Sequence, residues 1–250
     1  MKIFYTFFFV LLLSFSGKAL SKRHPVLKQT GSCLAVNLSC NGQMGAASLW
    51  AANYWKPASW RKNIQLGCGL RYTLSASGNK TIYNTAAIDL NRESNFIFSK
   101  KVPLNIDTLS IENHQTHTWN LMLCIVFPVK SWEVECRFDV LGFSSGSRKQ
   151  ATLQYGEEGE AIRKGSVIPA PRNLLLLGDN NRGTLNATLG VKHKLKHSWF
   201  GEFGLQYLRN EYQFDRPVQY KNSIGQSIFT DRYRAVTLGA MIGLVYSLKK

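Results

Sequence analysis

The sequence predicts an all-β protein, a transmembrane antiparallel up-and-down β-barrel of eight strands. Segments of about ten residues alternate apolar with polar or small side chains, as strands with one lipid face and one lumen face do. The connections between these segments alternate in length, short and then long, like periplasmic turns and extracellular loops. The chain also opens with a segment that has the form of an export signal.

Residues 1–20 are predicted to be a cleaved signal peptide. Lys2 precedes an apolar run at residues 3–15, and small residues such as Gly17 and Ala19 follow. The run is short for a helical span, so we expect export rather than anchoring. A basic segment at 21–31 then leads into the barrel, which is expected to occupy residues 32–250.

The middle strands show the alternation most clearly. From Ile64 to Leu74 every second residue is apolar, apart from Cys68, and the residues between are polar or small. From Trp132 to Val140 the apolar positions alternate with a charged set, namely Glu133, Glu135, Arg137 and Asp139. Four successive charges on one strand face cannot point at lipid, so that face is expected to line the lumen.

The later strands continue the pattern. They are expected over Leu185–Leu195, over a segment that includes Phe203–Tyr207, and over a final run that ends at Leu248. Counting back from a last strand that ends in the periplasm gives six strands after residue 60 and a seventh at about 44–55. An even number of strands requires an eighth, for which residues 32–40 are the candidate.

The connections and their flanking residues suggest an orientation. Short turns are expected near 57–60, 129–131 and 196–198, and long, polar loops near 76–110, 145–175 and 213–231. Five aromatic residues beside the short turns are expected to form a periplasmic girdle: Trp55, Trp60, Trp132, Trp199 and Tyr246. A secreted β-sandwich is the alternative fold, but its dry core would not tolerate the charged, glycine-rich inward set.

The chain is basic, with 31 Lys and Arg against 15 Asp and Glu and a net charge of +16. Many basic residues fall beside the short turns and the C-terminus, namely Lys56, Arg61, Lys62, Lys130, Lys192, Lys194, Lys196, Lys249 and Lys250. This distribution argues against nucleic-acid binding and for a cationic periplasmic rim on anionic outer-membrane lipids. Solvated lysines without a partner are the alternative.

Eight charged residues are candidates for a network inside the lumen: Arg71, Glu133, Glu135, Arg137, Asp139, Lys192, Lys194 and Glu202. An eight-stranded barrel has an interior that side chains just fill, so a wide pore is not expected. The network is interpreted as a salt-bridged plug, and a narrow polar path or ligand site is the alternative.

Support for catalysis or metal binding is thin. His114 and His117 precede a descending strand on the outer side, where a lipid-acting enzyme would need them, but no hydroxyl or carboxylate partner is specified. No catalytic residue, metal site or cofactor is therefore predicted. The five cysteines are expected to be mostly free, with a bridge between Cys124 and Cys136, equidistant from residue 130, as the alternative.

Several segments resemble small outer-membrane β-barrel proteins of Bacteroidota, within the OmpX/OmpW-like or porin-family group. The similar segments are 69–72, 138–146, 173–180 with 185–186, 231–234 and 243–248. The resemblance covers about residues 44–248 and implies architecture rather than activity. It also implies that the barrel-insertion machinery reads the last strand, although this chain ends Leu248-Lys249-Lys250 where such chains often end on an aromatic residue.

The predicted function is a non-enzymatic outer-membrane barrel with a largely plugged polar lumen, long extracellular loops and a structural or surface-interaction role. A narrow channel or small-ligand transporter is the first alternative. A lipid-modifying outer-membrane enzyme is the second. An extracellular partner is left open.

Overall fold

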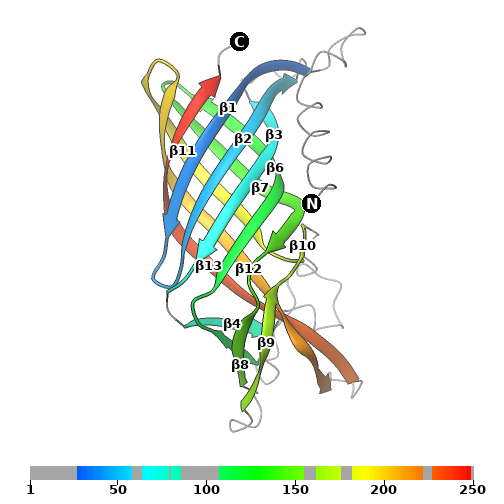
Figure 1. Ribbon diagram of the computed structural model, residues 1–250. Coiled ribbons are helices and arrows are strands. Elements are labelled where there is room, and N and C mark those ends of the chain that lie inside the picture. The colour runs from blue at the N-terminus through cyan, green and yellow to red at the C-terminus, as the bar shows by residue number, and fades with distance from the viewer. Residues whose placement is uncertain are drawn as a thin grey trace.

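The computed structural model describes residues 27–57, 64–78, 80–85, 107–154, 162–175, 182–221 and 227–248 (Figure 1). These residues form thirteen β-strands in one antiparallel sheet. Among them no helix is long and apolar enough to cross a membrane. The predicted signal peptide at 1–20 and the girdle residue Trp60 lie outside the described residues.

Eight of the strands pair in a closed ring, here called the first circuit. In order around the ring they are β1 (Leu27–Cys40), β2 (Gly45–Pro57), β3 (Gln65–Ala76), β6 (Gln115–Val129), β7 (Trp132–Ser145), β11 (Leu185–Lys196), β12 (Trp199–Lys221) and β13 (Ser227–Leu248). Strand β13 pairs back onto β1, with Val36 opposite Leu244, so this ring has no free edge.

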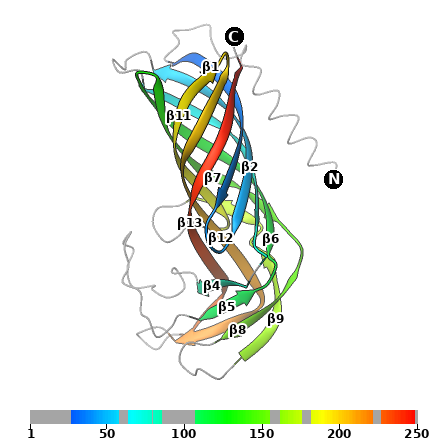
Figure 2. The same ribbon diagram turned by 90° about the vertical axis from the view of Figure 1, so that its left-hand side faces the viewer.

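A second, smaller ring shares the two longest strands with the first. Strands β4 (Thr81–Thr85), β5 (Thr108–Ile111), β8 (Lys149–Gln154) and β9 (Ile162–Pro169) pair in series, and this series joins β13 at one side and β12 at the other. These six strands are here called the second circuit, which lies beyond one end of the first (Figure 2). A short strand, β10 (Arg172–Leu174), pairs with β7.

The all-β antiparallel class is confirmed, but eight strands is too few for this sheet, which has thirteen. The difference lies in the predicted long loops. Residues 76–110 and 145–175 include β4, β5, β8, β9 and β10, while β12 and β13 extend through much of 213–231. The first strand also begins at Leu27 rather than residue 32, with a bulge between Gln29 and Gly31.

The first circuit has two distinct ends. At the turn end, the hairpins β6–β7 and β11–β12 turn through Lys130-Ser131 and His197-Ser198, and the last strand finishes nearby. Lys130 and His197 have positive φ angles of 54° and 51°, a conformation that tight turns require. The opposite end, which carries the second circuit, is here called the extension end (Figure 1).

Side chains of the first circuit alternate between an exposed apolar face and a buried interior. Outward positions on every strand carry apolar side chains, and the most exposed include Leu38, Leu49, Phe203, Leu238 and Ile242, at 53–65% exposure. Inward positions are buried, and many are polar or charged. This is the reverse of a water-soluble sheet protein, in which the apolar face is covered.

Two separate apolar clusters fill the interior. One lies toward the turn end of the first circuit and includes Trp50, Tyr54, Met122 and Val245. The other fills the second circuit with Tyr83, Leu109, Ile111, Ala151, Leu153, Val167, Tyr212, Phe214 and Tyr233, and reaches Met44, Ala46, Leu208 and Ala235 of the first. The second cluster therefore covers the extension end of the barrel interior.

Candidate functional site

The charged interior of the first circuit is the candidate site. Glu133, Glu135, Arg137 and Asp139 follow one another on one face of β7, because a strand turns every second side chain to the same side. From Glu135 onward these side chains are fully buried. They meet Lys192 from β11, Glu202 from β12 and Arg71 from β3, which the ring brings to the same interior.

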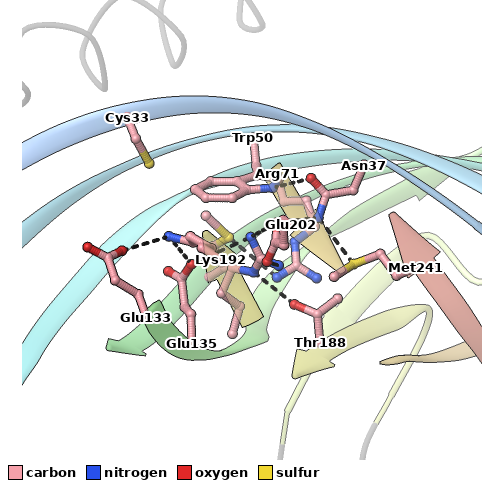
Figure 3. Close-up of polar contacts among 12 residues, drawn as sticks. Cys33, Asn37, Trp50, Arg71, Glu133, Glu135, Thr188, Lys192, Glu202 and Met241 are labelled. Carbon is pink, nitrogen blue, oxygen red and sulfur yellow. Dashed lines mark hydrogen bonds and ion pairs between the residues drawn. The ribbon is translucent and has the colours of Figure 1, made fainter. Parts of the chain in front are cut away.

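A continuous chain of ion pairs runs through this interior. The Lys192 Nζ lies 2.5 Å from the Glu135 Oε2 and 3.9 Å from the Glu133 Oε2. The Arg137 Nη1 lies 3.7 Å from the same Glu135 oxygen, and the Arg137 guanidinium also pairs with both oxygens of Glu202. Figure 3 shows Lys192 between the two glutamates, with Glu202 close by on the other side.

A second pair lies nearer the extension end. The Arg71 Nε lies 3.5 Å from the Asp139 Oδ1, and the Arg71 Nη1 donates to the backbone carbonyl of Asn186 over 3.3 Å. The other Asp139 oxygen accepts from the Asn120 side chain at 2.6 Å and from the Asn186 backbone N–H at 3.0 Å. Both members of this ion pair, Arg71 and Asp139, are thus held in place by further hydrogen bonds.

Neutral side chains that sequence reasoning missed complete the network. The Tyr54 hydroxyl donates to the Glu135 Oε1 at 2.8 Å, and the Asn37 amide donates to the Glu202 Oε2 at 3.0 Å. The Trp50 Nε1 donates to the Asn37 Oδ1, and the Arg137 guanidinium lies 4.4 Å from the centroid of the Trp50 ring (Figure 3). The one signal in the sequence that could have indicated them is their position on the strands, where they alternate with outward-facing residues and so face the interior.

The buried charges balance. Arg71, Arg137 and Lys192 carry three positive charges, and Glu135, Asp139 and Glu202 carry three negative ones. Burying an unpaired charge is very costly, whereas pairing and hydrogen bonding offset much of that cost. The ion pairs and their hydrogen-bond partners join seven strands across the interior, namely β1, β2, β3, β6, β7, β11 and β12.

The remaining predicted residues lie at the turn end. Lys194 is exposed near the end of β11, where the register shifts before Lys196, so it does not enter the buried network. Glu133 is at the rim, with its side chain 33% exposed. In the girdle set, Trp199 packs on Tyr246 and Trp132 on His193, with ring centroids 4.8 and 4.2 Å apart, while Trp55 is half-buried.

A pocket of about 140 Å³ lies at the turn end of the interior. Its lining includes Lys192, Glu133, Tyr54, Cys33 and Phe200. This volume accommodates a few water molecules or a small polar ligand. The pocket borders the chain of ion pairs, which fills the interior beyond it.

The two candidate histidines do not converge. His114 is buried in the second circuit, with its Nδ1 3.3 Å from the Thr81 Oγ1. His117 lies on the outer face of β6, where its Nδ1 is 2.7 Å from the Tyr72 hydroxyl. In the part of the chain that the structure describes, no group of three potential metal ligands gathers.

The five cysteines are free thiols. The alternative of a Cys124–Cys136 bridge is wrong because the β6–β7 hairpin turns about residues 130–131, not about residue 130 alone. Cys124 is therefore opposite Arg137 and faces inward, while Cys136 is opposite Ile125 and faces outward.

Comparisons with known proteins add little. No family model and no curated protein matches the chain. Among solved structures, neisserial surface protein A has a TM-score of 0.33 at 10% identity, over 89% of this chain and 96% of that one. A major outer membrane protein from Thermus thermophilus has a TM-score of 0.34 at 11% identity, over 88% and 100%.

A FadL homologue from Pseudomonas aeruginosa has a TM-score of 0.21 at 8% identity, over 81% of this chain and 68% of that one. The evidence for the architecture of this protein is its own closed strand pairing.

Proposed function

We propose that the protein is a non-enzymatic outer-membrane β-barrel, with eight strands of the first circuit in the membrane and the second circuit outside the cell. Its role is structural or directed at a surface partner. The signal peptide expected at residues 1–20 supports export, and recognition of the last strand by the barrel-insertion machinery belongs to the same proposal.

One observation carries the proposal: the inversion of polarity across the first circuit. Its exposed face is a band of apolar side chains, while its interior buries six paired charges. Water would not favour such a surface, but lipid does, and a closed ring leaves no backbone group unpaired at a sheet edge. The secreted sandwich would need the opposite arrangement.

The interior contacts support a lumen that does not conduct. Side chains of an eight-stranded ring just fill its interior, and here they are tied together by ion pairs. Beyond them, Met44, Ala46 and Leu208 join the apolar cluster of the second circuit. A solute would have to displace both layers.

The barrel is tested by gel mobility of protein extracted from the outer-membrane fraction, with and without boiling. A closed barrel resists detergent until it is heated. We therefore expect the unboiled protein to migrate as a folded form at a different apparent mass, and boiling to convert that band into the band of the unfolded protein. A soluble protein without a mobility shift would contradict the proposal.

A narrow channel remains the second candidate, and the pocket of about 140 Å³ beside Lys192 is the observation that favours it. Planar-bilayer recordings separate the two. The protein in the vesicles is first shown to be heat-modifiable, which means that boiling changes its gel mobility. Such vesicles should give no conductance steps if the lumen is plugged. Reproducible steps from the same vesicles would establish the channel instead.

A lipid-modifying enzyme is the third candidate, and the separation of His114 from His117 gives it no support. It is tested by comparing membrane lipid profiles of cells that carry the wild type, His114→Ala or His117→Ala. We expect three identical profiles. A lipid species that disappears with either variant would contradict the non-enzymatic role.

A further inference from the structure

The pocket at the turn end of the first circuit is bordered by one base and one acid. Lys192 on β11 and Glu133 on β7 both line this pocket, and the strand pairing sets the two residues directly opposite each other. The Lys192 side chain is 4% exposed and the Glu133 side chain is 33% exposed. The acid therefore lies at the mouth of the pocket, and the base lies deeper.

These two charges are close together, but no hydrogen bond joins them. The Lys192 Nζ lies 3.9 Å from the Glu133 Oε2, which is beyond hydrogen-bond distance (Figure 3). An ammonium group has three N–H donors, and among the described residues the Glu135 Oε2 is the one acceptor within reach of the Lys192 Nζ. The Glu133 carboxylate accepts no hydrogen bond from a described residue. Both groups therefore line the pocket with unused hydrogen-bonding capacity.

The other residues that line the pocket are uncharged. Polar and aromatic side chains share its wall, namely Ser32, Gln65, Ser247, Tyr54 and Phe200. The wall as a whole therefore carries one positive and one negative charge. Its volume of about 140 Å³ is several times what one water molecule needs, so a ligand with several heavy atoms fits.

We infer that this pocket binds a small zwitterion, a molecule that carries an ammonium and a carboxylate group as a free α-amino acid does. The ligand ammonium donates to the Glu133 carboxylate, and the ligand carboxylate accepts from the Lys192 Nζ. Hydrogen bonds in which the groups are ionised are about twice as strong as neutral ones. The inference rests on the proposed membrane barrel, which places the mouth of the pocket on the periplasmic side.

Ions of a single charge fit the pocket less well than a zwitterion does. A cation on Glu133 would lie close to Lys192, and an anion on Lys192 would lie close to Glu133, because these two side chains are 3.9 Å apart. Like charges at such distances repel each other. Beyond Lys192, the ion pairs of Glu135 with Lys192 and Arg137 fill the interior. The ligand is therefore held at one end of the barrel and does not pass through.

The test titrates detergent-purified, heat-modifiable protein with glycine and measures the rate at which iodoacetamide alkylates Cys33. This thiol lines the pocket, so a bound ligand should slow its reaction. Cys40 is exposed at the other end of the same strand and is the internal control. Peptide mass spectrometry distinguishes the cysteines. Acetate and methylammonium are the comparison probes, because each carries one of the two charges of glycine.

Glu133→Gln removes the partner of the ligand ammonium at a partly exposed position, so the barrel should still fold. Glu112→Gln removes an exposed carboxylate between β5 and β6 and is the matched control. We expect glycine to protect Cys33, but not Cys40, in the wild type and in the control. Half-protection should need about tenfold more glycine in Glu133→Gln, and about tenfold more acetate or methylammonium than glycine in the wild type.

Several results would overturn the inference. Equal protection by glycine in Glu133→Gln and in the control would show that Glu133 does not bind the ligand. Protection by acetate or methylammonium that equals that by glycine would show a site for a single ion. A heat-modifiable barrel whose Cys33 ignores glycine, or does not react at all, would overturn the site and leave the barrel standing. A wild type that boiling does not shift would overturn both.

Discussion

Glu135 holds the central place among the buried side chains of the first circuit. Its carboxylate contacts Lys192, Arg137 and the Tyr54 hydroxyl, and the side chain is fully buried. Glu133, two residues earlier on the same strand, approaches only Lys192, at 3.9 Å, and is partly exposed. The two glutamates therefore separate a buried from a peripheral ion pair within one strand.

Glu135→Gln is expected to lower the free energy of unfolding by about 3–5 kcal/mol, because it leaves two buried cations without their shared anion. Glu133→Gln should cost less than about 1 kcal/mol, as exposed pairs do. Urea unfolding of both variants in lipid vesicles measures the difference. Equal losses would mean that Glu135 does not organise the interior.

His114 makes the second circuit sensitive to acid. It lies outside the strands that are proposed to span the membrane, and burial, aided by the nearby charge of Lys149, lowers its pKa from 6.5 to about 4. The folded state therefore binds fewer protons than the unfolded state between these values. The stabilising effect is complete above pH 6.5, falls as the pH drops toward 4, and amounts to about 3 kcal/mol at its full extent.

Hydrogen-exchange protection factors for β4, β5, β8 and β9 should accordingly fall between pH 7 and pH 4.5. His114→Gln is expected to abolish this pH dependence. His117→Gln changes a histidine on the outer face of β6 and should retain the pH dependence. A pH dependence that survives His114→Gln would show that another group is responsible.

At the scale of the element, glycines on the inner faces of the strands determine how closely neighbours approach. A Cβ at Gly190 on β11 would overlap the carboxylate of Glu202, which Arg137 and Asn37 hold in place. Gly201, by contrast, lies on the outer face of β12, where a Cβ would meet only the exposed Leu195 side chain, at 3.5 Å, an ordinary contact. The two positions thus differ in whether the network must move.

Gly190→Ala is expected to destabilise the barrel by about 1–3 kcal/mol, since it displaces Glu202 from Arg137. Gly201→Ala should be within about 0.5 kcal/mol of the wild type. The temperature of the gel-mobility transition reports both. A tolerated Gly190→Ala would indicate that Glu202 can leave the network without cost.

The first-circuit strands were predictable because an exposed apolar face and a buried polar interior impose a period of two over ten or more residues. The expected strand from Trp132 to Val140 begins where β7 begins and lies within it, and the alternating charges on β7 identified most of the interior ion pairs. Strands β4 and β5 have only five and four residues, and β5 pairs with the distant β8. Such short pieces carry too little periodicity to be distinguished from loops.

The interior was predictable only in part, for a related reason. Charges on a strand face stand out in a sequence, but Asn37, Trp50 and Tyr54 are ordinary residues whose role appears only when the ring closes. Lys194 shares the parity of Lys192 but is exposed near the end of its strand, where the environment is no longer the lumen. The alternation along a strand therefore predicts which face a side chain is on. The distance of the residue from the end of the strand decides whether its charge is buried.

For the whole molecule, the two apolar clusters indicate two separately packed units. Leu153 is fully buried in the second circuit and contributes nothing to the cluster near the turn end. Leu205 is 50% exposed on the outer band and belongs to neither cluster. Loss of one unit need not unfold the other.

Leu153→Ala should destabilise the second circuit by about 2–5 kcal/mol through the cavity it leaves, while the gel-mobility shift of the barrel persists. Leu205→Ala should affect neither. Limited proteolysis of intact vesicles, combined with the gel assay, distinguishes the units. Loss of the mobility shift in Leu153→Ala would mean that the molecule unfolds as one.

Strands β12 and β13, 23 and 22 residues long, belong to both rings, and of the thirteen strands they come last along the chain. Neither ring can close before these two strands have paired. They connect β11 with β1 in the first circuit and β9 with β4 in the second. Until then the earlier strands leave free edges open to wrong partners. Closure is thus a late event that joins residues far apart in sequence, a kind of step that is slow in folding.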